Sequence, residues 1–119
     1  MIAEQLSHRV EDWLADLKAA NVVVLDVREL TDVTDYMIVA SGRSGRHVRS
    51  LAEHIVEQSK KHGQQPLGVE GLDQGEWVLV DLCDVVTHVM QPEVRDFYQL
   101  EKLWGRERVV EPTATSGRR

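Results

Sequence analysis

The chain has little cysteine, no long apolar run and a deficit of positive charge. Its one cysteine, Cys83, cannot form an internal disulfide or a zinc cluster, which favours a reducing compartment. The longest apolar stretches, such as residues 21–25 and 36–40, are strand-sized and far too short to cross a bilayer. The N-terminus lacks the basic and apolar regions of a signal peptide. We therefore expect a cytoplasmic protein without membrane contact.

Basic residues are scarce in the part of the chain that is expected to fold. The whole chain has 14 Lys and Arg against 20 Asp and Glu, a formal charge of −6. Residues from Gly105 onward hold four of the basic and two of the acidic residues, which leaves 10 against 18, or −8. Proteins that bind nucleic acid through its phosphates normally have a basic face, so direct sequence-specific binding to nucleic acid is not expected. An acidic domain suits a basic protein partner or simply solubility, and composition does not decide between these.

Apolar residues at helical spacing predict three helices. The first covers residues 2–20, the second about 44–62, and the third begins at Pro92, since proline fits the first turn of a helix. In the second helix the apolar residues recur at i, i+3, i+4, i+7 and i+8, the clearest helical pattern of the chain. Ser44 is its expected N-cap and Gly63 the glycine that follows its end.

Short β-branched and apolar segments predict about five strands. They lie at residues 22–27, 36–40, 66–70, 77–82 and 85–90. The order α-β-β-α-β-β-β-α predicts one α+β (mixed α/β) domain over residues 1–104, with a five-stranded mixed sheet and three helices. Residues 105–119 are rich in Arg, Glu, Thr, Ser and Pro, and we expect them to form a disordered C-terminal tail.

The last two strands are expected to form a hairpin with a two-residue turn at Cys83 and Asp84. On one face this register pairs Leu82 with Val85, Val80 with Thr87 and Val78 with Val89. On the other face it pairs Trp77 with Met90, Leu79 with His88 and Asp81 with Val86. The first face is suited to a core. The second is either a protein-binding surface or a sheet face covered by a helix, with Trp13 or Trp104 as the cover.

Side chains that could carry catalysis do not form a convincing set. The loop at residues 41–46 precedes a helix and could hold a phosphate, but it lacks the lysine of a P-loop, so a strand-to-helix turn is the preferred interpretation. Acids at strand ends, among them Asp26 and Asp81, suggest metal-dependent nucleotidyl transfer only faintly, because no Asp-x-Asp pair occurs. We expect no enzyme activity, no cofactor and no metal.

Several blocks of the sequence are similar, in the same order, to one known family. They are VLDVR (24–28), TDYMIVASG (34–42), PLGVEG (66–71), WVLVD (77–81), DVVTHVM (84–90) and FYQLEKLW (97–104). The chain thereby resembles the bacterial ribosomal silencing factors, the RsfS/Iojap family, over about residues 5–104. Cys83 stands where the family usually has glycine, and the tail has no family role that we can assign.

The resemblance implies a nucleotidyltransferase-like fold without catalytic carboxylates. It also implies binding to protein fourteen of the large ribosomal subunit, a basic protein at the subunit interface. The bound factor would block subunit joining and repress translation when nutrients are short. Homodimers are implied as well.

Combining the resemblance with the hairpin predicts one partner-binding face. Its residues are Trp77, Leu79, Asp81, Val86, His88 and Met90. Two alternatives stay open. One is a residual metal-dependent nucleotidyltransferase built on Ser41 and Gly42. The other is an RNA-binding ribosome-assembly adaptor that uses Arg43, Arg46 and Arg49.

Overall fold

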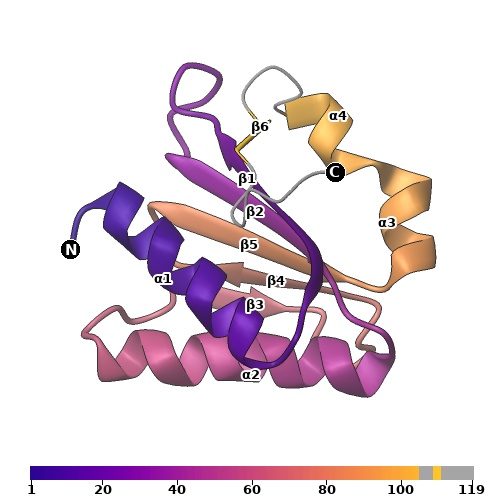
Figure 1. Ribbon diagram of the computed structural model, residues 1–119. Helices are drawn as coiled ribbons and strands as arrows, with labels where there is room; N and C mark the ends of the chain where they lie inside the picture. The colour runs from indigo at the N-terminus through magenta and orange to yellow at the C-terminus, as the bar shows by residue number, and fades with distance from the viewer. Residues whose placement is uncertain (105–108, 111–119) are drawn as a thin grey trace.

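A mixed sheet lies between two helical layers in the computed structural model, which describes residues 1–104 and 109–110 (Figure 1). The helices are α1 (Ala3–Asp16), α2 (Gly45–Lys61), α3 (Pro92–Tyr98) and α4 (Leu100–Trp104). The strands are β1 (Ala20–Asp26), β2 (Tyr36–Ser41), β3 (Gly68–Glu70), β4 (Trp77–Asp81), β5 (Val85–Met90) and β6 (Val109–Val110). In the sheet they follow the order β3-β4-β5-β2-β1-β6, with β2 and β5 parallel and all other neighbours antiparallel. No described helix is both long and apolar enough to cross a membrane.

The predicted mixed α+β architecture is confirmed, with two refinements at the C-terminal end. The helix expected from Pro92 is divided at Gln99, whose left-handed backbone (φ 49°) separates α3 from α4. The short strand β6, which pairs with Val24 and Leu25 of β1, lies inside the stretch expected to be a disordered tail. The rest of that expected tail, residues 105–108 and 111–119, lies outside the described residues.

Helix α2 begins and ends as its sequence predicts. The Ser44 side chain accepts a hydrogen bond of 3.1 Å from the backbone N–H of His47, which satisfies one of the free donors of the first turn. At the other end Gly63 takes a positive φ of 79°, which a residue with a side chain adopts at a cost. Between these caps the apolar stripe of α2 is buried against the sheet.

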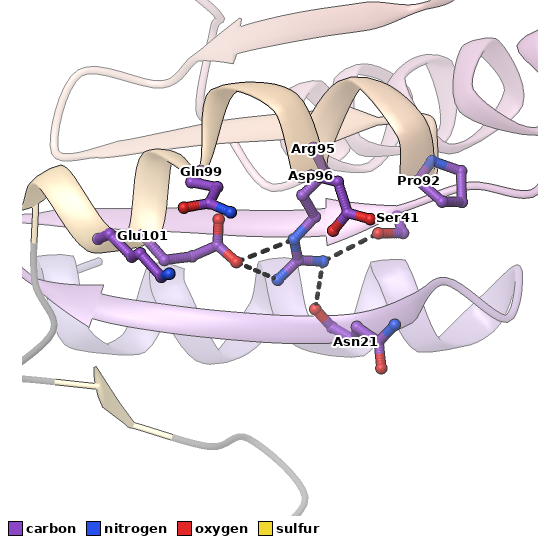
Figure 2. Close-up of a pocket in the computed structure, with 8 residues that line it drawn as sticks. Asn21, Ser41, Pro92, Arg95, Asp96, Gln99 and Glu101 are labelled. Carbon is purple, nitrogen blue, oxygen red and sulfur yellow. Dashed lines mark hydrogen bonds and ion pairs between the residues drawn. The ribbon is translucent and has the colours of Figure 1, made fainter.

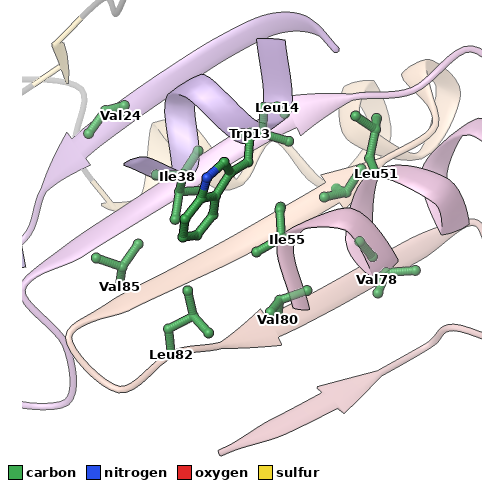
Figure 3. Close-up of a cluster of buried hydrophobic side chains, with 14 of the residues drawn as sticks. Trp13, Leu14, Val24, Ile38, Leu51, Ile55, Val78, Val80, Leu82 and Val85 are labelled. Atoms are coloured by element: carbon green, nitrogen blue, oxygen red, sulfur yellow. The ribbon is translucent and has the colours of Figure 1, made fainter. Parts of the chain in front are cut away.

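The main core lies between the sheet and the layer formed by α1 and α2 (Figure 3). Val78, Val80 and Leu82 of the hairpin are fully buried there. They share this cluster with Leu51 and Ile55 of α2. Helix α1 contributes Trp13 and Leu14, so the suggestion that Trp13 covers Trp77 is wrong. Trp77 belongs to the opposite face of the sheet.

The β4–β5 hairpin has the register predicted from its sequence. The pairs run from Trp77 opposite Met90 to Asp81 opposite Val86. The Leu82 N–H then donates to the Val85 carbonyl at 2.9 Å. Cys83 has a φ of 76°, and the Asp84 N–H donates to the Leu82 carbonyl at 3.0 Å, which closes a tight γ-turn around Cys83. A side chain at such a position is strained, because its Cβ approaches the following carbonyl.

We expect Cys83→Gly to stabilise the protein by about 0.5–1 kcal/mol, since glycine relieves this strain but gains entropy in the unfolded chain. Urea unfolding checks the prediction, with Cys83→Ala as the matched control that removes the thiol and keeps Cβ. A Cys83→Gly protein no more stable than Cys83→Ala would show that the turn is unstrained.

Candidate protein-binding surface

The sheet face opposite α1 and α2 is only partly covered. Every second residue of β4 points to this face: Trp77, Leu79 and Asp81, each of which is partly exposed. Helix α3 lies beside the hairpin on the same side (Figure 1), and the ring of Tyr98 is 4.8 Å from the ring of Trp77, centroid to centroid. The helix therefore borders Trp77 without closing off the β4 end of the sheet.

Met90 does not belong to the exposed part of this face. It is fully buried in a second cluster with Leu25, Val27, Met37 and Val39. Side chains of α3 and α4, Val94 and Leu100, pack on that cluster. The expectation that Met90 contacts a partner is therefore wrong, because α3 and α4 cover the half of the sheet where it lies.

Val86 and His88 offer a partner very little surface, since they are 8% and 7% exposed. His88 instead holds Trp77 in place, because the Trp77 indole N–H donates to His88 Nδ1 at 2.9 Å. Burial lowers the pKa of His88 to about 4, so the ring is neutral near pH 7 and Nδ1 is free to accept. His88, one of the six predicted contact residues, therefore orients Trp77 and offers little contact surface of its own.

Asp81 is engaged within its own hairpin. Its Oδ1 accepts a hydrogen bond of 2.8 Å from the backbone N–H of Cys83, inside the strained turn. The sequence places Asp81, the acid of the predicted face, in contact with a partner. That carboxylate already has a structural role, so its substitution would change the turn as well as any interface.

Two exposed aromatic residues that sequence reasoning did not assign to the site extend it onto α3. Phe97 is 79% exposed and Tyr98 49%, and their rings meet edge to face at 4.9 Å. With Trp77 they form what we call the aromatic patch: Trp77, Phe97 and Tyr98. One signal was available in the sequence, because two adjacent aromatic residues on a helix cannot both face the sheet beneath it.

An acidic hollow adjoins the aromatic patch on the β3 side. Its cavity of about 390 Å³ is lined by Glu70, Gly71, Gln74, Glu76, Trp77 and Leu79. A side chain at Gly71 (φ 86°) would collide with the Trp77 carbonyl, so this wall of the hollow requires glycine. Glu70 and Glu76 were not predicted as site residues, because both lie outside the two hairpin strands whose alternating side chains define the predicted face.

A buried arginine fastens the α3–α4 layer to the sheet (Figure 2). Arg95 is 9% exposed, and its Nε donates to Glu101 Oε2 at 3.0 Å. Its Nη1 donates to the Asn21 carbonyl at 2.6 Å and to Ser41 Oγ at 2.9 Å. One side chain thus joins α3, α4, β1 and β2 beside a polar cavity of about 340 Å³. The position of the aromatic patch depends on these hydrogen bonds of Arg95.

The residues suggested for nucleotidyl transfer are not assembled into a metal site. Ser41 Oγ accepts from Arg95, Asp26 forms an ion pair with Arg28 at 2.6 Å, and Asp81 binds its own turn. Across residues 1–104 and 109–110, no three His, Cys, Asp or Glu side chains are grouped closely enough to hold a metal ion.

Known proteins are similar to this chain in both sequence and fold. Residues 2–118 match the family described as "Ribosomal silencing factor during starvation". The chain is 43% identical over 108 residues to the ribosomal silencing factor RsfS of Chromobacterium violaceum. The aligned residues make up 91% of this chain and 88% of that protein. A crystal structure of a Chromobacterium violaceum protein superimposes with a TM-score of 0.87 at 40% identity, covering 96% of this chain and 98% of that one.

A more distant relative occurs in a eukaryote. The mouse protein named "Mitochondrial assembly of ribosomal large subunit protein 1" is 37% identical over 89 residues, which are 72% of this chain and 39% of the mouse protein. The family match spans almost the whole sequence, and the bacterial relative agrees with it over nearly its full length. The chain therefore belongs to the family of ribosomal silencing factors.

Proposed function

We propose that the protein represses translation by binding protein fourteen of the large ribosomal subunit, with the aromatic patch and Leu79 as its contact surface. The observation that carries this proposal is the pair of exposed rings, Phe97 and Tyr98, beside the half-buried Trp77. Family membership supports a ribosomal target, and the name of the mouse relative refers to the large subunit. The proposal places the protein in the cytoplasm and does not depend on the homodimer that the resemblance implies.

The aromatic patch has the properties of a binding anchor. Contiguous exposed apolar surface is uncommon on a small soluble domain and marks interaction sites. Trp and Tyr at the centre of such surfaces often supply most of the binding free energy, because they bury a large area with few rotatable bonds. Phe97 gains most from a partner, since 79% of its surface is open.

Charge favours a basic partner for the same surface. The folded part carries an excess of acids, 18 against 10 by the count above. Glu70 and Glu76 lie in the hollow next to Trp77. Opposite charge speeds association and selects against acidic partners, although it adds less to affinity than the apolar anchor does.

Silencing by occupancy needs no catalytic step. The described residues span about 32 × 32 × 24 Å. A rigid body of this size on the interface side of one subunit would hold the other subunit away, because subunit joining requires direct contact between the two surfaces. The expectation that the protein is not an enzyme fits this mechanism.

The anchor is held ready for binding by its hydrogen bond to His88. A neutral His88 accepts from Trp77 Nε1, and the ring of Tyr98 contacts the same indole. Since the indole has one donor and that donor is satisfied inside the protein, Trp77 presents its ring face and edge to a partner. Less conformational freedom is then lost on binding.

We expect Phe97→Ala to weaken binding to purified protein fourteen while leaving the fold intact, because the removed ring is mostly exposed. Trp77→Ala should cost about 2 kcal/mol or more if Trp77 is a hot spot, which is about 30-fold in Kd. Calorimetric titration without RNA measures both effects. Leu30→Ala, which removes an apolar side chain 55% exposed in the β1–β2 connection, is the control.

Co-sedimentation with large subunits and a subunit-joining assay should follow the same ranking of variants. Binding of folded Phe97→Ala and Trp77→Ala at wild-type strength would contradict the proposal. Wild-type binding that requires ribosomal RNA, and that is lost on changing Arg43 and Arg46, would favour the RNA-binding adaptor instead.

Acid should destabilise the protein through His88. The folded ring takes up a proton near pH 4, whereas in the unfolded chain it does so near its ordinary value of 6.5. Between these pH values only the unfolded state binds the proton, so the free energy of unfolding falls as the pH drops from 6.5 to 4. Above pH 6.5 the contribution of neutral His88 to stability is fully present. Over that range the loss amounts to about 3 kcal/mol. In His88→Gln, which keeps an acceptor for Trp77, urea unfolding at several pH values should show a correspondingly smaller acid loss; an unchanged pH profile would contradict the assignment.

A further inference from the structure

The acidic hollow beside Trp77 has no assigned role, and its lining combines apolar and acidic side chains. Trp77 and Leu79 are its two apolar residues, and Glu70 and Glu76 are its two acids. Both glutamates are exposed, and among the described residues neither side-chain carboxylate has a hydrogen bond or an ion pair. An apolar surface with two uncommitted carboxylates at its edge suits a ligand with a long apolar stem and a cationic end.

We propose that this hollow is a socket for an arginine side chain of the partner protein. The inference rests on the proposed function, because it names the chemistry by which the same face recognises a basic protein. The methylene stem would lie against Leu79 and the indole of Trp77. The guanidinium would reach Glu70 and Glu76.

Arginine fits this lining better than lysine does. A guanidinium is planar, stacks on an indole face and donates up to five hydrogen bonds, so it can serve an aromatic wall and two carboxylates together. An ammonium is a compact and strongly hydrated charge that loses more on leaving water. The cavity of about 390 Å³ is open to solvent at its rim, which leaves room for the head group to enter.

The socket also replaces Asp81 as the source of the charge contact. The Asp81 carboxylate accepts a hydrogen bond from the N–H of Cys83, while the carboxylates of Glu70 and Glu76 have no such bond to any described residue. Glu70 is opposite Leu79 in the β3–β4 pairing, so it is held next to the apolar part of the socket by the sheet itself. Gly71 keeps the wall close, because any larger residue would strike the Trp77 carbonyl.

A small probe tests the socket without any ribosomal component. N-acetylarginine amide is titrated into ¹⁵N-labelled protein while the indole N–H signal of Trp77 is followed by NMR, with the neutral N-acetylcitrulline amide as the matched probe. We expect a saturable shift with the arginine derivative alone, and its loss in Glu70→Gln/Glu76→Gln. No shift, or the same shift in that double variant, would overturn the inference.

Binding to purified protein fourteen then places the socket in the interface. Glu70→Gln and Glu76→Gln should each weaken binding ~5- to 10-fold and reduce its salt dependence, as expected for charge-assisted bonds. Glu53→Gln on α2, an exposed residue of the other helical layer, makes the same change in net charge and is the control. If both socket variants match this control while Trp77→Ala binds weakly, the arginine socket is wrong and the docking proposal stands. If the probe shifts Trp77 but wild-type protein does not bind protein fourteen, the docking proposal fails and the socket remains.

Discussion

The register of the β4–β5 hairpin is the constraint on which the rest of the molecule depends. A turn of two residues places Val78, Val80 and Leu82 toward α1 and α2, and Trp77, Leu79 and Asp81 toward the other side. A shift of one residue would exchange the two sets, burying an aspartate and exposing the core. The hairpin therefore fixes both the stability of the domain and the surface that it offers, and the protein retains a strained turn at Cys83 to keep that register.

The size of the open surface is set by a second interaction, between Arg95 and the sheet. Arg95 joins positions that are far apart in sequence, since its partner Asn21 precedes it by 74 residues. The guanidinium holds α3 over Met90 and leaves Phe97 and Tyr98 exposed. Docking of α3 on the sheet thus buries Met90 and adds the exposed rings of Phe97 and Tyr98 to the surface. The binding surface that we propose is therefore composed of β4 and α3 together.

These two interactions also explain what the sequence could predict. The hairpin pairs, the Ser44 cap and the Gly63 helix end follow local rules, in which neighbours along the chain decide the outcome, and all are confirmed. The burial of Met90 depends instead on where α3 settles on the sheet, and no periodicity within residues 85–90 carries that information. The acids Glu70 and Glu76 are brought to Trp77 by the edge strand β3 and the segment before β4, a tertiary effect of the same kind.

The loop between β2 and α2 resembles the strand-to-helix turn of an enzyme, yet several of its polar groups are bonded within the protein. Free backbone N–H groups at the start of a helix attract phosphate, but here one of them and the N–H of the residue before the N-cap are used internally. The N–H of Arg43 donates to His47 Nδ1 at 2.9 Å, and the N–H of His47 donates to Ser44. The His47 ring itself reaches back to the Leu17 carbonyl at 2.7 Å, which ties α2 to the end of α1. Ser41 likewise accepts from Arg95, so these groups of the loop join the helices to the sheet. These hydrogen bonds give the loop a role in joining α1, α2 and the sheet, and the binding face that we propose is the one that carries Trp77.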